Sequence, residues 1–213
     1  MPRVLLINPN STETMTASML ASARAVAPSV DFTGWTSRAA PAAIQGPDDG
    51  RRAEPPLLKL VARAGARFDC IIIGCFDDTG LAAASDLAEC PVLGIGQAAF
   101  CMAMLRGLRF SVVTTLPVSV PVIEENIRRY GMAPWLDRVR ASELSVLETE
   151  GEGAAPCDTI AREAELAIAE DESQCIILGC GGMSRLAAEV RARVSVPVID
   201  GVEAAARLSS ALT

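Results

Sequence analysis

Two cysteines hold equivalent places in a repeated pentapeptide. Residues 71–75 read Ile-Ile-Ile-Gly-Cys, residues 176–180 read Ile-Ile-Leu-Gly-Cys, and the 213-residue chain contains no histidine. Histidine is the side chain that usually carries protons near neutral pH. A pair of thiols, Cys75 and Cys180, is the most evident replacement. We expect each to follow a strand and precede a helix start, where the helix N-terminus lowers the pKa of a thiol.

Two thiols that face one site suit the exchange of a proton at carbon. One thiolate removes a proton from one face of the carbon, and the opposite thiol returns a proton to the other face. Each group needs hydrogen-bond reach and a pKa near the working pH. The enolate oxygen that develops needs donors already aimed at it. Candidates are the backbone N–H groups of 76–80 and 181–184 and the hydroxyls of Thr114 and Thr115, for which a local turn or capping role is the simpler alternative.

The other cysteines fit the apolar core, where a reduced thiol is a small hydrophobic group. A zinc site built from two C-x4-C pairs fails on distance. Cys70 and Cys75 would lie roughly 16 Å apart at about 3.3 Å per strand residue, whereas a zinc–sulfur bond is about 2.3 Å. No metal site is therefore predicted. The cysteines assigned to the core are Cys70, Cys90, Cys101, Cys157 and Cys175.

Cofactor-dependent chemistry finds little support. Lys59 is the only lysine, in what reads as an amphipathic helix surface, so a pyridoxal phosphate Schiff base is not expected. Residues 94–99 approach a dinucleotide fingerprint, but no acidic residue ends the next candidate strand to hold a ribose. We predict a site that works without a cofactor.

Composition excludes several other classes. The formal net charge of −7 argues against nucleic-acid binding, which needs a basic face. No apolar run approaches the roughly 20 residues of a membrane span, and residues 1–3 do not begin a signal peptide. Seven cysteines, an odd number, favour reduced thiols in a cytoplasm. We expect a cytoplasmic protein with a small-molecule substrate and without nucleic-acid or membrane partners. We also expect a homo-oligomer, for which an alanine-rich surface helix is one of many candidate interfaces.

Short apolar runs alternate with longer segments of helical period, which is typical of a parallel α/β fold. Asn10 can cap the first helix, with Glu13 three residues on. The predicted strands are 3–7, 29–34, 70–74, 92–95, 109–114, 142–147, 175–179 and 196–199, and the predicted helices are 12–27, 53–66, 79–88, 97–106, 119–131, 157–170, 184–193 and 202–212.

The two halves of the chain align with each other at a nearly constant offset of 105–106 residues. Cys75 corresponds to Cys180, and residues 81–83 repeat as 186–188. We therefore expect two pseudo-symmetric α/β lobes, each a parallel sheet flanked by helices, with the active site in the cleft between them.

Ligands of parallel sheets bind beyond the carboxyl ends of the strands. Segments 8–12, 75–80, 114–117 and 180–184 follow predicted strands and are rich in small and polar residues. They define the expected functional side. The proline- and glycine-rich stretch 35–56 is predicted to be a long loop over the cleft.

The motifs together resemble the aspartate/glutamate racemase superfamily, and most closely its hydantoin racemase branch. The resemblance covers nearly the whole chain. The residues that carry it are Leu6-Ile7-Asn8-Pro9-Asn10-Ser11-Thr12, Gly74-Cys75-Phe76-Asp77-Asp78, Val112-Val113-Thr114-Thr115, Leu178-Gly179-Cys180-Gly181-Gly182-Met183 and Pro197-Val198-Ile199-Asp200-Gly201.

The resemblance implies two α/β lobes, no cofactor, and Cys75 and Cys180 as catalytic residues between the lobes. The lobes would be 1–97, with 206–213 packing back on it, and 98–205. Residues 44–46 resemble a substrate-side loop. The substrate-binding residues expected on this basis are Asn10, Ile44, Phe76, Asp78, Thr79, Thr114, Thr115, Gly181 and Gly182.

Departures from the family pattern bear on the substrate. Amino-acid racemases of the wider family usually have Cys-Thr-His after the second cysteine strand, whereas here Gly181-Gly182-Met183 follows Cys180. This favours a neutral cyclic ureide, whose C5–H is more acidic than an amino-acid α-proton. Asp77-Asp78 would repel a free carboxylate, or else cap the following helix. Thr79 stands where relatives often have proline, so the resemblance does not determine the conformation of this loop.

The resulting prediction is racemisation at C5 of a 5-substituted hydantoin. Alternatives are racemisation of allantoin, cis–trans isomerisation of a maleate-type diacid, or a non-catalytic two-lobed binding protein. An arylmalonate decarboxylase needs only one cysteine, so the presence of both Cys75 and Cys180 argues against this activity.

Overall fold

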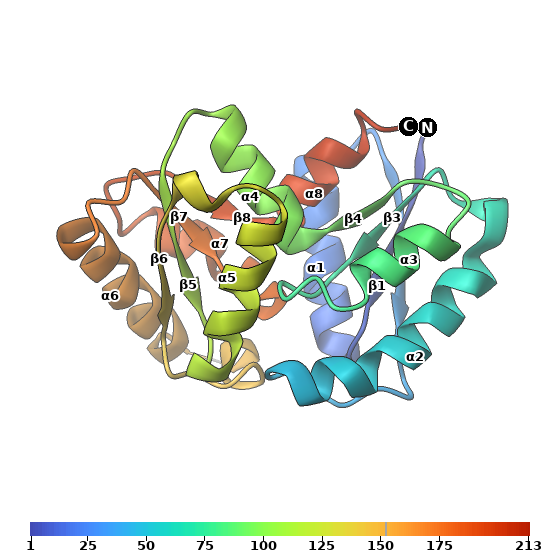
Figure 1. Cartoon of the computed structure of the whole chain (residues 1–213), viewed down its shortest axis with the longest axis horizontal. Coiled ribbons are helices and arrows are strands. Elements are labelled where there is room, and N and C mark those ends of the chain that lie inside the picture. Colours follow the sequence, from blue (N-terminus) through green and yellow to red (C-terminus); the bar gives the residue numbers. More distant parts are fainter. Residues whose placement is uncertain (152) are drawn as a thin grey trace.

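A computed structural model describes residues 1–151 and 153–213. It contains two four-stranded parallel sheets with helices around them, as Figure 1 shows. The strands are β1 (Arg3–Asn8), β2 (Asp31–Thr36), β3 (Cys70–Ile73), β4 (Val92–Gly94), β5 (Phe110–Thr114), β6 (Leu136–Ala141), β7 (Cys175–Leu178) and β8 (Val198–Asp200). The helices are α1 (Glu13–Val26), α2 (Pro47–Ala64), α3 (Leu81–Leu87), α4 (Ile95–Leu105), α5 (Val120–Arg129), α6 (Ala155–Glu170), α7 (Ala187–Arg191) and α8 (Gly201–Ser209).

The two sheets have the same topology. Their strand orders are β2-β1-β3-β4 and β6-β5-β7-β8, so each strand of the first sheet has its counterpart four strands later. The register agrees as well, because Val4 of β1 pairs with Cys70 of β3 and Phe110 of β5 pairs with Cys175 of β7. The predicted α/β class with two similar lobes is confirmed.

The strand predicted at 142–147 is wrong. The sixth strand is β6 at 136–141, in which charged residues interrupt the apolar pattern. Arg140 is nevertheless buried, because it forms ion pairs with Asp171 at 2.5 Å and Glu163 at 3.1 Å. A buried arginine needs such partners, and they lie far along the sequence. Glu143 has a positive φ of 63°, which ends the extended segment.

The loop predicted at 35–56 is shorter than expected, because α2 begins at Pro47 and carries Pro55 and Pro56 inside it. Proline at the first helical position lacks only an N–H that would be unpaired anyway. The buried face of α2, which includes Leu57 and Val61, outweighs the two internal prolines. The remaining loop reaches the second lobe, where the Val146 N–H donates to Gln45 Oε1 at 2.9 Å.

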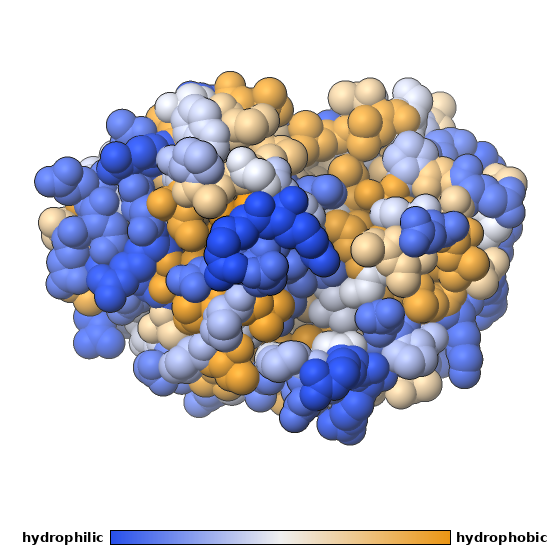
Figure 2. Space-filling model, in the orientation of Figure 1, coloured by the Kyte–Doolittle hydropathy of each residue, from blue (hydrophilic) through white to orange (hydrophobic). Residues whose placement is uncertain are grey.

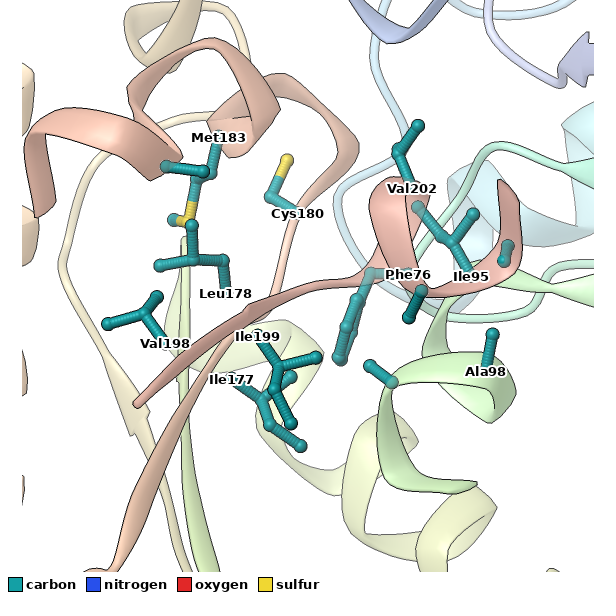
Figure 3. Close-up of a cluster of buried hydrophobic side chains, with 14 of the residues drawn as sticks. Phe76, Ile95, Ala98, Ile177, Leu178, Cys180, Met183, Val198, Ile199 and Val202 are labelled. Atoms are coloured by element: carbon teal, nitrogen blue, oxygen red, sulfur yellow. The ribbon is translucent and has the colours of Figure 1, made fainter. Parts of the chain in front are cut away.

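One apolar core joins the two lobes. Buried side chains of both sheets belong to a single cluster, and Figure 3 shows Phe76 between Ile199 on one side and Ile95 on the other. Helix α8 packs against α1 and α4, so the end of the chain contacts the first lobe. The expected boundary between residues 97 and 98 falls inside α4 and stays a prediction, as does the return of 206–213.

The described residues include no helix that is both long and apolar enough to span a membrane. Figure 2 shows hydrophilic residues over both lobes, interrupted by apolar patches.

Candidate active site

The ends of two equivalent strands approach each other between the lobes. Gly74 and Gly179 each extend their sheet by one residue, since their N–H groups donate to Ile7 O and Val113 O at 2.8 Å. Cys75 and Cys180 follow directly. A Cβ added to Gly181 would lie 3.0 Å from Met19 Sδ and 3.1 Å from Gly74 O, so a side chain here would push the strand ends apart by a few tenths of an ångström.

Both thiols line one small cavity, of about 30 Å³. Cys75 is partly exposed and Cys180 is 8% exposed. The cavity brings together most of the predicted site residues, namely Asn10, Ile44, Cys75, Phe76, Thr114, Thr115, Cys180 and Gly181. The same wall includes Met15, Gly74, Asp77, Ser119, Val146 and Gly179.

Asp78 lies outside this wall and caps a distant helix. Its two carboxylate oxygens accept the N–H groups of Gly96 and Gln97 at 3.0 and 2.8 Å, in the first turn of α4. Tyr130 Oη also donates to it at 2.9 Å. The capping role that the sequence suggested is present, but the helix is α4 and not the following one.

Thr79 and Gly182 also lie behind the cavity wall. Thr79 Oγ1 is 3.4 Å from Cys75 Sγ, close enough for a hydrogen bond to the thiol. The backbone N–H of Gly182 lowers the pKa of Cys180 against the larger effect of burial. Both residues therefore act on a thiol and not on the cavity surface.

Hydrogen bonds hold the side chains of Thr114 and Asn10 in place. Thr114 Oγ1 donates to Gly179 O at 3.0 Å, which ties β5 to the strand end that carries Cys180. Asn10 Oδ1 accepts from Asn8 Nδ2 at 2.8 Å and from the Thr12 N–H at 2.9 Å. The N-cap of α1 is Thr12, without a side-chain capping bond, so the prediction that Asn10 caps this helix is wrong.

The expectation that both thiols have lowered pKa values is also wrong for this closed arrangement. Burial raises the pKa of Cys75 well above its usual value and raises that of Cys180 to about 11. Cys75 is followed by a turn, and α3 starts only at Leu81, too far away to stabilise a thiolate. Cys180 is the N-cap of a single 3-10 segment at 181–186. Both thiols are thus neutral while the site is closed.

Asp77 shares the cavity with the two thiols. Burial raises its pKa to about 7, and its charge raises the pKa of Cys75 and of Cys180. No arginine or lysine belongs to the described cavity wall. Arg185, the nearest arginine in sequence, donates instead to Thr149 O at 3.1 Å and to Gly151 O.

Sequence reasoning missed Met15, Ser119 and Val146 as wall residues. Met15 lies one turn into α1, directly after the polar segment 8–12, so its position was a usable signal. Ser119 and Val146 come from connections after β5 and β6, and the misplaced sixth strand hid the second of them.

A metal centre finds no support among the described residues, which contain no group of three or more His, Cys, Asp or Glu side chains suited to an ion. Cys70 and Cys175 are fully buried at the start of their strands. They share the repeat but lie at the opposite end from the cavity.

Known proteins resemble this chain over nearly its full length. A family model described as Asp/Glu/Hydantoin racemase matches residues 4–209. A hydantoin racemase of Rhizobium meliloti is 43% identical across 97% of this chain and 87% of its own. The allantoin racemase of Pseudomonas fluorescens has a TM-score of 0.94 at 37% identity, with 99% and 90% of the two chains covered. That of Klebsiella pneumoniae has a TM-score of 0.94 at 35% identity, with 100% and 87% covered. The chain therefore belongs to the Asp/Glu/hydantoin racemase family and is a racemase, an isomerase that acts on small molecules.

Proposed function

We propose that this racemase inverts C5 of 5-substituted hydantoins without a cofactor, with Cys75 and Cys180 as the two acid/base groups. The observation that carries the proposal is the placement of two thiols, from equivalent ends of duplicated strands, on one cavity between the lobes. The names of the relatives support a ureide ring as substrate.

In the proposed mechanism, the ring lies between the thiols with C5 facing both. One cysteine first loses its thiol proton to solvent, because both thiols are neutral in the closed site. Its thiolate then takes the C5 proton, and the negative charge that develops moves to the C4 oxygen. The other cysteine, as thiol, donates its proton to the opposite face of C5. The roles reverse for the other enantiomer, so each turnover leaves the site with the same total number of protons.

The enolate oxygen needs donors that do not have to rearrange. The backbone N–H group of Gly181, at the start of the 3-10 segment and on the cavity wall, is the proposed source. The rest of the ring would contact the cavity-wall residues Asn10, Ile44, Phe76, Thr114 and Thr115. Thr79 and Asp78 would hold that wall in place from behind.

A cavity of about 30 Å³ has room for little more than a water molecule. Substrate entry therefore requires the cleft to widen. The contact between Gln45 and Val146 is the place to expect this change, because it joins the loop at Ile44 to the second lobe next to the cavity.

Allantoin is the second candidate substrate, since two similar solved structures are allantoin racemases. A maleate-type diacid fits less well, because two carboxylates need cationic partners and the described cavity wall supplies none. Cytoplasmic location, a homo-oligomer and the lack of a nucleic-acid partner stay predictions.

Deuterium exchange tests the function. One enantiomer of a 5-substituted hydantoin or of allantoin, incubated in D2O, should exchange its C5 proton with enzyme faster than the spontaneous rate. Cys75→Ser and Cys180→Ser should each lower the rate by at least about 100-fold. Cys101→Ser, at a partly exposed cysteine outside the cavity, is the matched control and should leave the rate unchanged. No enhanced exchange with any of these ureides would refute the proposal.

A further inference from the structure

Asp77 is an acidic group on the cavity wall that the two-thiol mechanism does not use. Its charge acts on both Cys75 and Cys180, which places the carboxyl near the two reacting groups. Its backbone is fixed, because Asn126 Nδ2 donates to Asp77 O at 2.8 Å. The backbone of Asp77 therefore has a defined place on the cavity wall, and the effect of its charge on both thiols places the carboxyl on the side of the ring that they would flank.

Three neighbouring charged groups are engaged elsewhere, and Glu150, whose charge also raises the pKa of Cys180, lies outside the cavity wall. Asp78 is bound to the first turn of α4 and to Tyr130. Arg129 donates to Asn126 Oδ1 at 2.9 Å, and Arg185 donates to the backbone of 149 and 151. Among the described wall residues Asp77 is the one carboxyl, and no cation of the wall neutralises it.

The carboxylate of Asp77 is partly buried, and without a cation it is stabilised by hydrogen-bond donors. A hydantoin ring carries two N–H groups, at N1 and N3, and no charge, so it supplies donors without adding a second negative charge. A ligand with its own carboxylate brings a second negative charge into a cavity where such charges are poorly screened. The same side chain can thus attract one class of ligand and repel the other.

We propose that Asp77 determines substrate class, by accepting a hydrogen bond from a ureide N–H and by excluding ligands that carry a carboxylate. The inference rests on the proposed function, because it takes the ligand to lie between Cys75 and Cys180. It assigns Asp77 to substrate recognition and leaves proton transfer to the thiols.

Three achiral ligands isolate this role from turnover. Hydantoin is the neutral ring, N-carbamoylglycine is its ring-opened carboxylate, and N-carbamoylglycinamide is the neutral ring-opened control. Calorimetric titration gives Kd for each with the intact protein. The wild type should bind the amide and the ring at least tenfold more tightly than the carboxylate.

Asp77→Asn removes the charge at nearly constant shape. It should weaken hydantoin binding, tighten N-carbamoylglycine binding, and so shift the ratio of their Kd values at least tenfold toward the acid. In steady state the variant should raise KM for the ureide more than it lowers kcat. Asp86→Asn, which removes an exposed carboxylate on α3, is the matched control and should leave the ratio unchanged.

A Kd ratio in Asp77→Asn within threefold of the wild type would overturn the proposal, and so would equal loss of affinity for acid and ring. If Asp77→Asn does not fold, Asp77→Ser and the wild-type comparison decide: a wild type that binds the acid as tightly as the amide refutes the role. The C5 exchange assay is a separate test. If the wild type catalyses exchange but the Kd ratio does not change in Asp77→Asn, only this inference is refuted. If the wild type catalyses no exchange, the proposed function itself is refuted.

Discussion

Replacing Asp77 by asparagine should stabilise the folded protein at mildly alkaline pH. Burial raises the pKa of this carboxyl from an ordinary 3.8 to about 7. Because the folded pKa lies above the unfolded one, the stability associated with the protonated group is fully present below about pH 4 and declines as the pH rises toward 7. Asparagine does not ionise, so its contribution does not decline.

The magnitude follows from the shift. Each pKa unit corresponds to 1.36 kcal/mol, so ionisation of Asp77 lowers wild-type stability by about 2 kcal/mol at pH 5.5 and about 4 kcal/mol at pH 8. Burying an amide has its own cost, but that cost is independent of pH. The stability of Asp77→Asn relative to the wild type should therefore rise by about 2 kcal/mol between these two pH values.

Urea denaturation at both pH values measures the difference by linear extrapolation. The lower pH stays above the isoelectric point of about 4.7, where the protein would be least soluble. Cys180, whose pKa is raised to about 11, remains a thiol throughout and does not contribute. If the difference between variant and wild type changes by less than about 0.5 kcal/mol, burial is not what holds the Asp77 proton.

Three other substitutions or treatments test separate parts of the structure. Asp78→Ala should lower the free energy of unfolding by about 2–3 kcal/mol in urea titrations, because it leaves the first turn of α4 uncapped, whereas Asp86→Ala should change it by less than about 0.5 kcal/mol. Gly181→Ala should lower kcat/KM at least about tenfold while leaving the melting temperature nearly constant, since the new Cβ would separate the strand ends by a few tenths of an ångström; unchanged kinetics would contradict that geometry. Alkylation by iodoacetamide, followed by mass spectrometry, should accelerate with pH and reach Cys180 at lower pH than Cys75, because the pKa of Cys75 is raised further; the reverse order would contradict the burial argument.

The sheets could be predicted because seven of the strands have a recognisable local sequence pattern. Buried parallel strands are continuous apolar runs, and segments such as 70–73 and 175–178 are of this kind. The sixth strand lies at a sheet edge and contains Arg138 and Arg140. Its place depends on acidic residues about 30 positions later, and no local pattern reports such partners.

The candidate site divides in the same way. Cys75 and Cys180 could be predicted because the repeat marks equivalent strand ends, and the carboxyl ends of parallel strands are where ligands bind. The cap made by Asp78 was misassigned because the helix it serves starts 17 residues further on. The thiol pKa values could not be predicted either, since burial depends on how closely two lobes approach and not on the residues next to each cysteine.

The raised thiol pKa values constrain how a site of this kind could work without histidine. A thiolate and an ionised Asp77 in one small cavity oppose each other, because each charge raises the pKa of the other groups. In the proposed mechanism a ureide relieves this conflict in two ways. Its N–H groups offset the charge of Asp77, and its acidic C5–H gives up a proton readily to the small fraction of cysteine present as thiolate. A carboxylate substrate would add a third negative charge and needs a cation that the described wall lacks. A cavity wall that holds a carboxylate and no cation therefore requires a substrate ring that is neutral and carries hydrogen-bond donors.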